Sequence, residues 1–260
     1  MTILDELSDY ARIRVKEKNK TVPFEKIKEQ ALALPRMNFE FEKALSRPGL
    51  SLICECKQAS PSKGQIAESG FPYLDIAREY AGAGADAISV LTEPKWFRGS
   101  DDYLREIADA VSVPCIRKDF TVDEYMIYEA RLLGASAVLL ICSILPEETI
   151  CEYIGVCDSL GLSALVEAHD ADEVDMALRA GARVVGVNNR NLKDFTVDIM
   201  NSVRLRERVP QEITFVSESG IMRPEDVKVL KENGTDAVLI GEMMMRADDK
   251  ASLIKELKEI

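Results

Sequence analysis

The chain of 260 residues carries 45 acidic and 33 basic side chains, and its 47% hydrophobic content is enough for a full core. The resulting net charge of −12 argues against nucleic acid or an anionic membrane surface as the main partner. No apolar run is long enough to span a membrane, and the charged, amphipathic start MTILDELSDYARIRVKEK lacks the apolar core of a secretion signal. We therefore expect a cytoplasmic protein.

The segment 1–45 precedes the first predicted strand and contains two helical stretches, interrupted near Thr21-Val22-Pro23. A proline tends to end a helix at or before the preceding residue, which explains the interruption. We interpret 1–45 as a helical extension packed on the rest of a single domain that covers 1–260.

The strand predicted over Ser51–Lys57 has one wholly apolar face and one face that becomes charged only at its carboxyl end. Residues two apart share a face of a strand, so Glu55 and Lys57 point the same way as Ile53. This pattern suits a barrel whose site lies at the carboxyl ends of its strands. The alternative is an edge strand with a solvated Glu/Lys pair, the usual environment of such pairs.

A faint internal repeat is the strongest architectural signal. Four segments recur at intervals of roughly 50 residues, and each has a glycine followed by an apolar run. They are GADAISV (84–90), GASAVLL (134–140), GARVVGV (181–187) and GTDAVLI (234–240). The glycine fits a helix C-cap, and the run is typical of a parallel strand buried on both faces.

Four further strands are expected between these repeats, at 51–57, 113–118, 163–167 and 213–217. Helical patterns alternate with the strands near 74–83, 102–110, 122–133, 147–160, 171–180, 198–207, 224–232 and 250–259. Strict alternation predicts right-handed βαβ units and a parallel sheet. Eight units favour an α/β fold, a closed (β/α)8 TIM barrel over 46–260. No GxGxxG follows the first strand, which weakens the dinucleotide-binding alternative.

Several predicted strands end in charged or polar side chains. These ends carry, in chain order, Glu55 and Lys57, Lys118, Glu167, Asn188, and Glu218-Ser219-Gly220. The carboxyl ends of barrel strands surround one opening, so lysines and glutamates that are distant in sequence converge there. One charged strand end is more often solvated than catalytic, but several on one rim favour catalysis.

Other polar residues have structural explanations. Thr121 with Glu124, and Asp170 with Glu173, have the spacing of a capping box. The only histidine, His169, stands just before the second pair, and we expect it to have a helix-entry role. A histidine-based metal site or catalytic triad is thereby almost excluded, which leaves acid–base chemistry to carboxylates and lysines.

Glycines follow the last two strands, in SESG (217–220) and IGEMMM (240–245). Backbone N–H groups after strands seven and eight of a barrel can hold phosphate, so we expect a phosphate site there, with ordinary turn glycines as the alternative.

Met243–Met245 are expected to fill gaps in the core. Trp96 and Phe97 follow the second strand and Phe120 the third, where they either cap the core or cover an aromatic substrate.

The six cysteines contain no CxxC pair, and most lie in apolar runs. We interpret them as small buried side chains of a protein in a reducing compartment. The oligomeric state stays open between a monomer and a weak dimer.

Seven strings of this sequence resemble the indole-3-glycerol-phosphate synthase family, the ring-closing decarboxylases of tryptophan biosynthesis. They are ECKQASPSKG, SVLTEPKWFRGS, RKDF, ALVEA, GVNNRNL, SESGI and LIGEMMMR, in family order from the first strand to the eighth. The resemblance implies a (β/α)8 barrel with an N-terminal helical extension. It further implies a lyase that needs neither cofactor nor metal and acts on an anionic sugar phosphate.

The implied substrate is 1-(2-carboxyphenylamino)-1-deoxyribulose 5-phosphate, whose ring carbon attacks the ketone before carbon dioxide and water leave. Lys118 matches the general acid at the carbonyl, and Lys57 matches the second lysine. Glu167 matches the general base and Glu55 the carboxylate that supports the lysines. Which lysine donates which proton is not decided by the sequence.

The resemblance also implies contacts to the substrate. Asn188 and Ser219 match polar contacts to the reacting sugar. The implied substrate-binding residues are Ser60, Phe97, Phe120, Arg190, Glu218, Gly220, Gly241 and Glu242. Ser60 matches a position near the anthranilate carboxylate, the two phenylalanines border the ring, and the glycines line the phosphate end.

Two alternatives remain at this stage. A Schiff-base aldolase of the same fold would use Lys57 or Lys118 as a covalent nucleophile. A non-catalytic phosphate-binding barrel would serve as a scaffold and would not need the inward lysines and glutamates.

Overall fold

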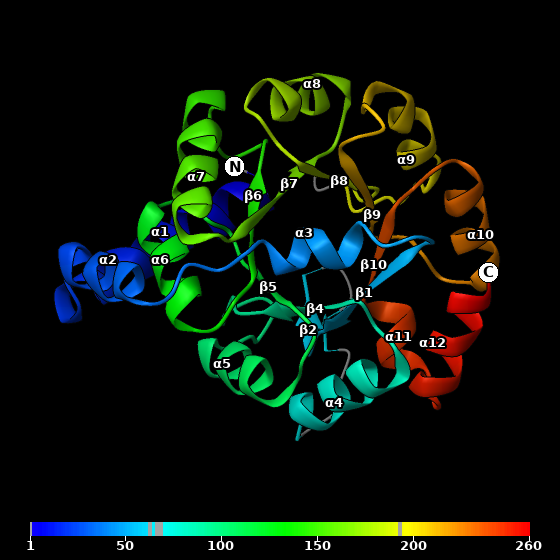
Figure 1. Cartoon of the computed structure of the whole chain (residues 1–260), viewed down its shortest axis with the longest axis horizontal. Helices are drawn as coiled ribbons and strands as arrows, with labels where there is room; N and C mark the ends of the chain where they lie inside the picture. Colours follow the sequence, from blue (N-terminus) through cyan, green and yellow to red (C-terminus); the bar gives the residue numbers. More distant parts are fainter. Residues whose placement is uncertain (1, 62–63, 66–69, 192–193) are drawn as a thin grey trace.

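In the computed structural model, which describes residues 2–61, 64–65, 70–191 and 194–260, eight short apolar runs form a closed parallel barrel (Figure 1). The barrel strands are β1 (Ser51–Cys56), β4 (Ala87–Leu91), β5 (Cys115–Lys118), β6 (Ala137–Ile141), β7 (Ser163–Ala168), β8 (Val184–Asn188), β9 (Thr214–Glu218) and β10 (Ala237–Ile240). Closure is made by β1 pairing with both β10 and β4. The predicted fold is therefore confirmed.

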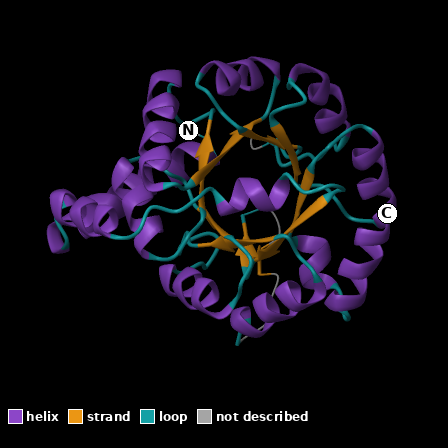
Figure 2. Cartoon of the chain, in the orientation of Figure 1, coloured by secondary structure: helices purple, strands orange, loops and turns teal. Residues whose placement is uncertain are grey.

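Helices surround the strand ring (Figure 2) because each carries an apolar stripe that packs on it. They are α4 (Tyr73–Ala83), α5 (Asp101–Ala110), α6 (Glu124–Leu132), α7 (Glu147–Leu160), α8 (Ala171–Arg179), α9 (Met200–Leu205), α10 (Pro224–Glu232) and α12 (Lys250–Glu259). A 3-10 turn, η1 (Arg206–Arg208), extends α9. The four repeat glycines follow helices with left-handed φ between 80° and 106°, as the sequence predicts.

The N-terminal extension contributes α1 (Ile3–Thr21), α2 (Phe24–Ala33) and α3 (Glu40–Leu45). The predicted interruption at Thr21-Val22-Pro23 separates the first two of these helices. In Figure 1, α3 lies across the barrel, and it contacts the starts of strands: the Ser163 hydroxyl accepts a hydrogen bond from the Glu42 N–H at 3.3 Å. It therefore covers the amino-terminal end of the barrel.

Helix α1 lies at the opposite end, where its Ile3 and Leu7 line the cavity above the strand ends. Buried residues of the extension, such as Leu4 and Phe41, belong to the same apolar core as the barrel residue Ile53. We infer from this shared core that the extension and the barrel form one domain. None of the described helices is long and apolar enough to cross a membrane.

One predicted helix start is wrong. The expected capping pair of Thr121 and Glu124 does not form, because α6 begins at Glu124 and its N-cap is Asp123. The Asp123 carboxylate accepts the Tyr125 N–H at 2.9 Å, whereas Thr121 is buried. An aspartate at the true cap is a better acceptor than a threonine two residues earlier. Asp170 does cap α8, accepting the Glu173 N–H at 3.0 Å.

Two smaller elements lie near the carboxyl ends of the strands. A hairpin of β2 (Ala59–Ser60) and β3 (Gly64–Gln65) follows β1, and a short helix, α11 (Glu242–Arg246), follows β10. Within this helix Met243 and Met244 are buried as expected, and Met245 is half-buried against the same core. Ser62 and Lys63 of the ECKQASPSKG string and Leu192 of GVNNRNL lie outside the described residues.

Candidate active site

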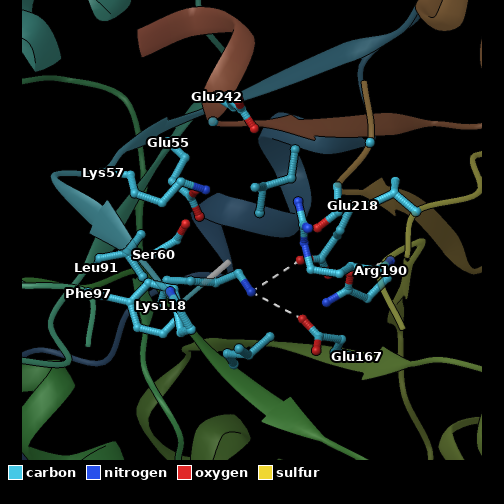
Figure 3. Close-up of a pocket in the computed structure, with 18 of the residues that line it drawn as sticks. Glu55, Lys57, Ser60, Leu91, Phe97, Lys118, Glu167, Arg190, Glu218 and Glu242 are labelled. Atoms are coloured by element: carbon cyan, nitrogen blue, oxygen red, sulfur yellow. Dashed lines mark hydrogen bonds and ion pairs between the residues drawn. The ribbon is translucent and has the colours of Figure 1, made fainter. Parts of the chain in front are cut away.

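A cavity of about 590 Å³ opens at the carboxyl ends of the strands, and every site residue predicted from the sequence lines it. Ligand cavities typically have volumes of several hundred Å³, so the space suits a small organic substrate. Figure 3 shows side chains from β1, β5, β7 and β9 converging on this space, as parallel closure requires.

Lys118 occupies the centre of the charged side chains. Its ammonium lies 3.1 Å from Glu167 Oε2 and 3.3 Å from Glu218 Oε2, the two contacts dashed in Figure 3. The three side chains are 15%, 3% and 2% exposed, so water screens these contacts little. One cation thus holds two buried carboxylates from β7 and β9.

This arrangement displaces all three pKa values. Burial lowers the pKa of Lys118, but the carboxylates of Glu167, Glu218 and Glu55 outweigh it and raise the pKa overall. Burial opposes ionisation of Glu167, yet Lys118 and His169 lower its pKa below the ordinary value. Burial raises the pKa of Glu218 to about 7 against the pull of Lys118, assisted by the charge of Glu167. The site therefore contains an ammonium, an ionised carboxylate and a carboxyl that titrates near neutrality.

A second pair lies on β1, where the Lys57 ammonium contacts the Glu55 carboxylate. Both side chains point into the cavity in Figure 3, as the alternation along the predicted strand requires. Gly241 makes room for them, because a Cβ there would collide with the Glu55 carboxylate and come within 2.8 Å of Lys57 Nζ. The solvated edge-strand alternative is therefore wrong.

One side of the cavity is apolar. Phe97 and Phe120 lie with their ring centroids 6.1 Å apart, and Leu139 and Ile141 continue this side along β6. Trp96 does not line the cavity; its ring packs edge-on against Tyr10 of α1. Of the two neighbouring aromatics, only Phe97 is placed to contact a bound ring.

The loop that carries Phe97 is held by a residue that the sequence analysis missed. Glu93 is completely buried, and its carboxylate accepts the backbone N–H groups of Lys95, Trp96 and Phe97 at 2.7–2.9 Å. A carboxylate can accept several N–H donors, which fixes the loop without a regular element. The sequence signal for this role is a glutamate that stands two residues after a strand and just before a turn-forming proline.

The opposite rim is polar. Asn188 Oδ1 accepts the Arg190 N–H at 3.0 Å, and the Arg190 guanidinium donates to the Phe195 carbonyl at 3.3 Å. Ser219 has a left-handed φ of 68° next to Gly220, so the chain turns sharply above β9. This rim can therefore present a guanidinium, an amide and backbone groups to an anion.

A buried charge network behind Lys118 also escaped the sequence analysis. Arg117, fully buried, contacts Asp101 and Glu129, each at 2.8 Å. Asp119 pairs with Arg14 of α1 at 2.6 Å, and the arginine holds its pKa at about 2 against the effect of burial. The RKDF string carried this signal: successive strand residues face opposite sides, so Arg117 and Lys118 cannot share an environment.

The described residues contain no cluster of three or more histidine, cysteine or acidic side chains arranged to hold a metal ion. The fold and this cavity define an enzyme of the TIM-barrel class with a lysine–carboxylate site at the strand ends.

Comparison with known proteins narrows this class. The model of the indole-3-glycerol phosphate synthase family matches residues 4–257, and the chain belongs to that family. An indole-3-glycerol phosphate synthase of Ruminiclostridium cellulolyticum is 54% identical over 98% of this chain and 98% of its own. One of Lachnoclostridium phytofermentans is 48% identical over 99% of each.

Solved structures support the fold alone. The chain superposes on a 3-hexulose-6-phosphate synthase with a TM-score of 0.63 at 16% identity, over 81% of this chain and 99% of that one. A thiamine phosphate pyrophosphorylase from Pyrococcus furiosus gives a TM-score of 0.61 at 17% identity, over 81% and 94%.

Proposed function

We propose that the chain converts 1-(2-carboxyphenylamino)-1-deoxyribulose 5-phosphate to indole-3-glycerol phosphate, carbon dioxide and water. One observation carries this proposal within the family: Lys118 lies between two buried carboxylates, with an aromatic wall on one side and a polar rim on the other. An aminobenzoate ring suits the wall, and a phosphorylated sugar suits the rim.

The orientation follows from the chemistry of each side. Phe97 and Phe120 would border the aromatic ring, and Ser60 would face its carboxylate. Arg190, Ser219 and backbone groups at Gly241 would face the sugar and its phosphate. Because the chain is acidic overall, the anion must be held by these local groups rather than by the net charge.

Ring closure forms a bond between the carboxylate-bearing ring carbon and the ketone carbon, while the carbonyl electron pair moves to oxygen. Lys118 is our candidate for stabilising and protonating this oxygen, since its raised pKa keeps it an ammonium at neutral pH. Cleavage of the bond to the carboxylate then releases carbon dioxide and returns its electron pair to the ring.

Dehydration needs an acid for the departing hydroxyl and a base for a carbon-bound proton. We assign the acid to Lys57, held by Glu55, and the base to Glu167, whose lowered pKa keeps it ionised. Each such group contributes on the order of 10²–10⁴ in rate. Asn188 would contact the reacting sugar beside Glu167.

The test is to mix the protein with the synthetic substrate, without added metal or cofactor, and follow indole fluorescence. Wild type is expected to turn over, and Lys118→Met to lose on the order of 10³-fold or more in kcat. Lys228→Met, an exposed change on α10, is the matched control and is expected to retain activity. A folded wild type with no fluorescence change refutes the proposal.

A Schiff-base aldolase remains distinguishable in the same experiment. Borohydride added with substrate would trap a stable adduct on a lysine nucleophile and none on an acid catalyst.

A cytoplasmic location is also part of the proposal, supported by six free cysteines, five of them buried, which suit a reducing compartment.

A further inference from the structure

His169 is the only histidine of the chain, and its ring lies beside the proposed general base. It follows β7 by one residue, so it stands two positions after Glu167 and on the same side of the chain. The ring Nε2 lies 3.5 Å from Glu167 Oε1, while Lys118 contacts the other carboxylate oxygen. Each oxygen of Glu167 thus faces a different nitrogen.

The other edge of the His169 ring is fixed by α8. Its Nδ1 lies 3.0 Å from Glu173 Oε2 and 3.1 Å from the Ser143 hydroxyl, which donates to the second Glu173 oxygen at 2.6 Å. The His169 N–H also donates to Glu173, at 2.8 Å, and Asn201 donates to the His169 carbonyl at 2.9 Å. The expected helix-entry role is therefore confirmed, although it leaves Nε2 unused.

The protonation of Nε2 follows from its surroundings. This atom is buried and has no hydrogen-bond partner of good geometry among the described residues. Nδ1 faces a carboxylate and must carry a proton, so in a neutral ring the Nε2 lone pair would face the oxygen of Glu167. A second proton replaces this repulsion with a charge-assisted contact between imidazolium and carboxylate.

The charges around the ring favour the same state. The titratable groups near it are Glu167 of β7, Glu173 and Asp170 of α8, Glu218 of β9, Lys118 of β5 beyond Glu167, and the thiol of Cys142 after β6. Burial lowers the pKa of His169, but the hydrogen bond that its ring donates to Glu173 and the charges of the nearby carboxylates outweigh burial and raise the pKa.

We propose that His169 is a positioning residue: as an imidazolium between Glu173 and Glu167, it holds the proposed base ionised and fixes the orientation of its carboxylate. The proposal rests on the role of Glu167 in the proposed function. His169 keeps both of its protons throughout; the proton removed from substrate goes to Glu167. With Lys118 on Oε2 and His169 on Oε1, the carboxylate cannot rotate without losing a contact.

The first test measures the ring directly and needs no activity. Because the chain has one histidine, labelling with ¹⁵N-histidine yields a single imidazole, whose protonation NMR resolves along a pH titration. In wild type we expect both nitrogens to be protonated at pH 6.5, since the pKa of the ring is raised. Glu167→Gln and Glu173→Gln are each expected to lower the histidine pKa by about 1–3 units, since each removes an adjacent opposite charge.

The second test measures catalysis. In His169→Gln we expect kcat to fall at least tenfold with KM within about twofold, and the acid limb of the kcat profile to move up by about 1–3 pH units as the pKa of Glu167 rises. Asp170→Asn is the matched control, since it perturbs the same helix start but keeps a capping side chain and the ring.

The outcomes separate the two proposals. A neutral imidazole at pH 6.5, or a histidine pKa that Glu167→Gln leaves unchanged, overturns the role of His169 whether or not the protein is active. An unmoved acid limb in His169→Gln overturns it as well. If wild type makes no indole-3-glycerol phosphate while the imidazolium is present and its pKa responds to Glu167→Gln, the proposed function fails and the contact between the two residues stands.

Discussion

Replacing Glu218 by glutamine should stabilise the folded protein at neutral pH. The Glu218 carboxyl is buried beside Glu167 and shares the ammonium of Lys118 with it, so ionising both carboxylates is unfavourable. Neither Glu218 oxygen makes a hydrogen bond of good geometry to a described residue. Glutamine has nearly the same shape, carries no charge, and leaves the Lys118–Glu167 contact in place.

The magnitude follows from the pKa of Glu218, which lies near 7 in the folded protein against an ordinary value of 4.5. Between these values the folded protein holds a proton that the unfolded chain has released, so rising pH favours unfolding. At 1.36 kcal/mol per pKa unit, the wild type loses about 3 kcal/mol of stability relative to Glu218→Gln between roughly pH 4.5 and pH 7. Above pH 7 the difference is constant.

Urea unfolding of both proteins at pH 5 and pH 8 measures this difference. We expect stabilities within about 1 kcal/mol of each other at pH 5 and an advantage of about 3 kcal/mol for Glu218→Gln at pH 8, a rise in Tm of roughly 6–12 °C. Comparing the two proteins cancels contributions from titratable groups that do not interact with Glu218. Equal stabilities at pH 8, or a variant less stable there, would refute the reasoning about a shared ammonium.

Three further changes test other parts of the structure. Arg117→Met removes a fully buried cation that contacts three carboxylates and leaves them only Lys18 and Arg14 as partners, so it should cost about 3–5 kcal/mol of stability in urea unfolding. A loss below about 1 kcal/mol would contradict the role of Arg117 in this network. Gly186→Ala places a Cβ against the Glu218 carboxylate and should lower kcat roughly tenfold, whereas Gly155→Ala, in open space, should leave it unchanged. Phe97→Ala should raise KM at least about tenfold with a smaller change in kcat, measured by indole fluorescence; an unchanged KM would remove the ring from the substrate site.

Much of the barrel could be predicted because its signals are local. Each repeat glycine ends a helix in a left-handed conformation, and the strand that follows it carries no charged side chain. The alternation of strands and helices then leaves few topologies. The prediction of the N-cap of α6 was wrong because the side chains of Thr121 and Asp123 can both accept a hydrogen bond from the first turn. Only the position of the first helical residue decides between them.

The charged residues of the site could be predicted for the same reason, since the strand ends of a closed barrel must meet. The charged residues packed behind them could not be predicted. Arg14 reaches Asp119 across 105 positions of sequence, and no local pattern reports such a pair. The ring of His169 was read only as part of a helix start, because its distance to Glu167 depends on how the chain bends after β7.

The pairing of the first barrel strand with the last has a consequence for synthesis on the ribosome. Ser51 of β1 lies opposite Ala237 of β10, and the glycine that gives Glu55 and Lys57 their room follows that final strand. During synthesis, Lys57 and Lys118 therefore emerge long before the cavity around them exists. Fragments that stop short of β10 leave one edge of β1 unpaired, so they are open to aggregation and unable to turn over substrate.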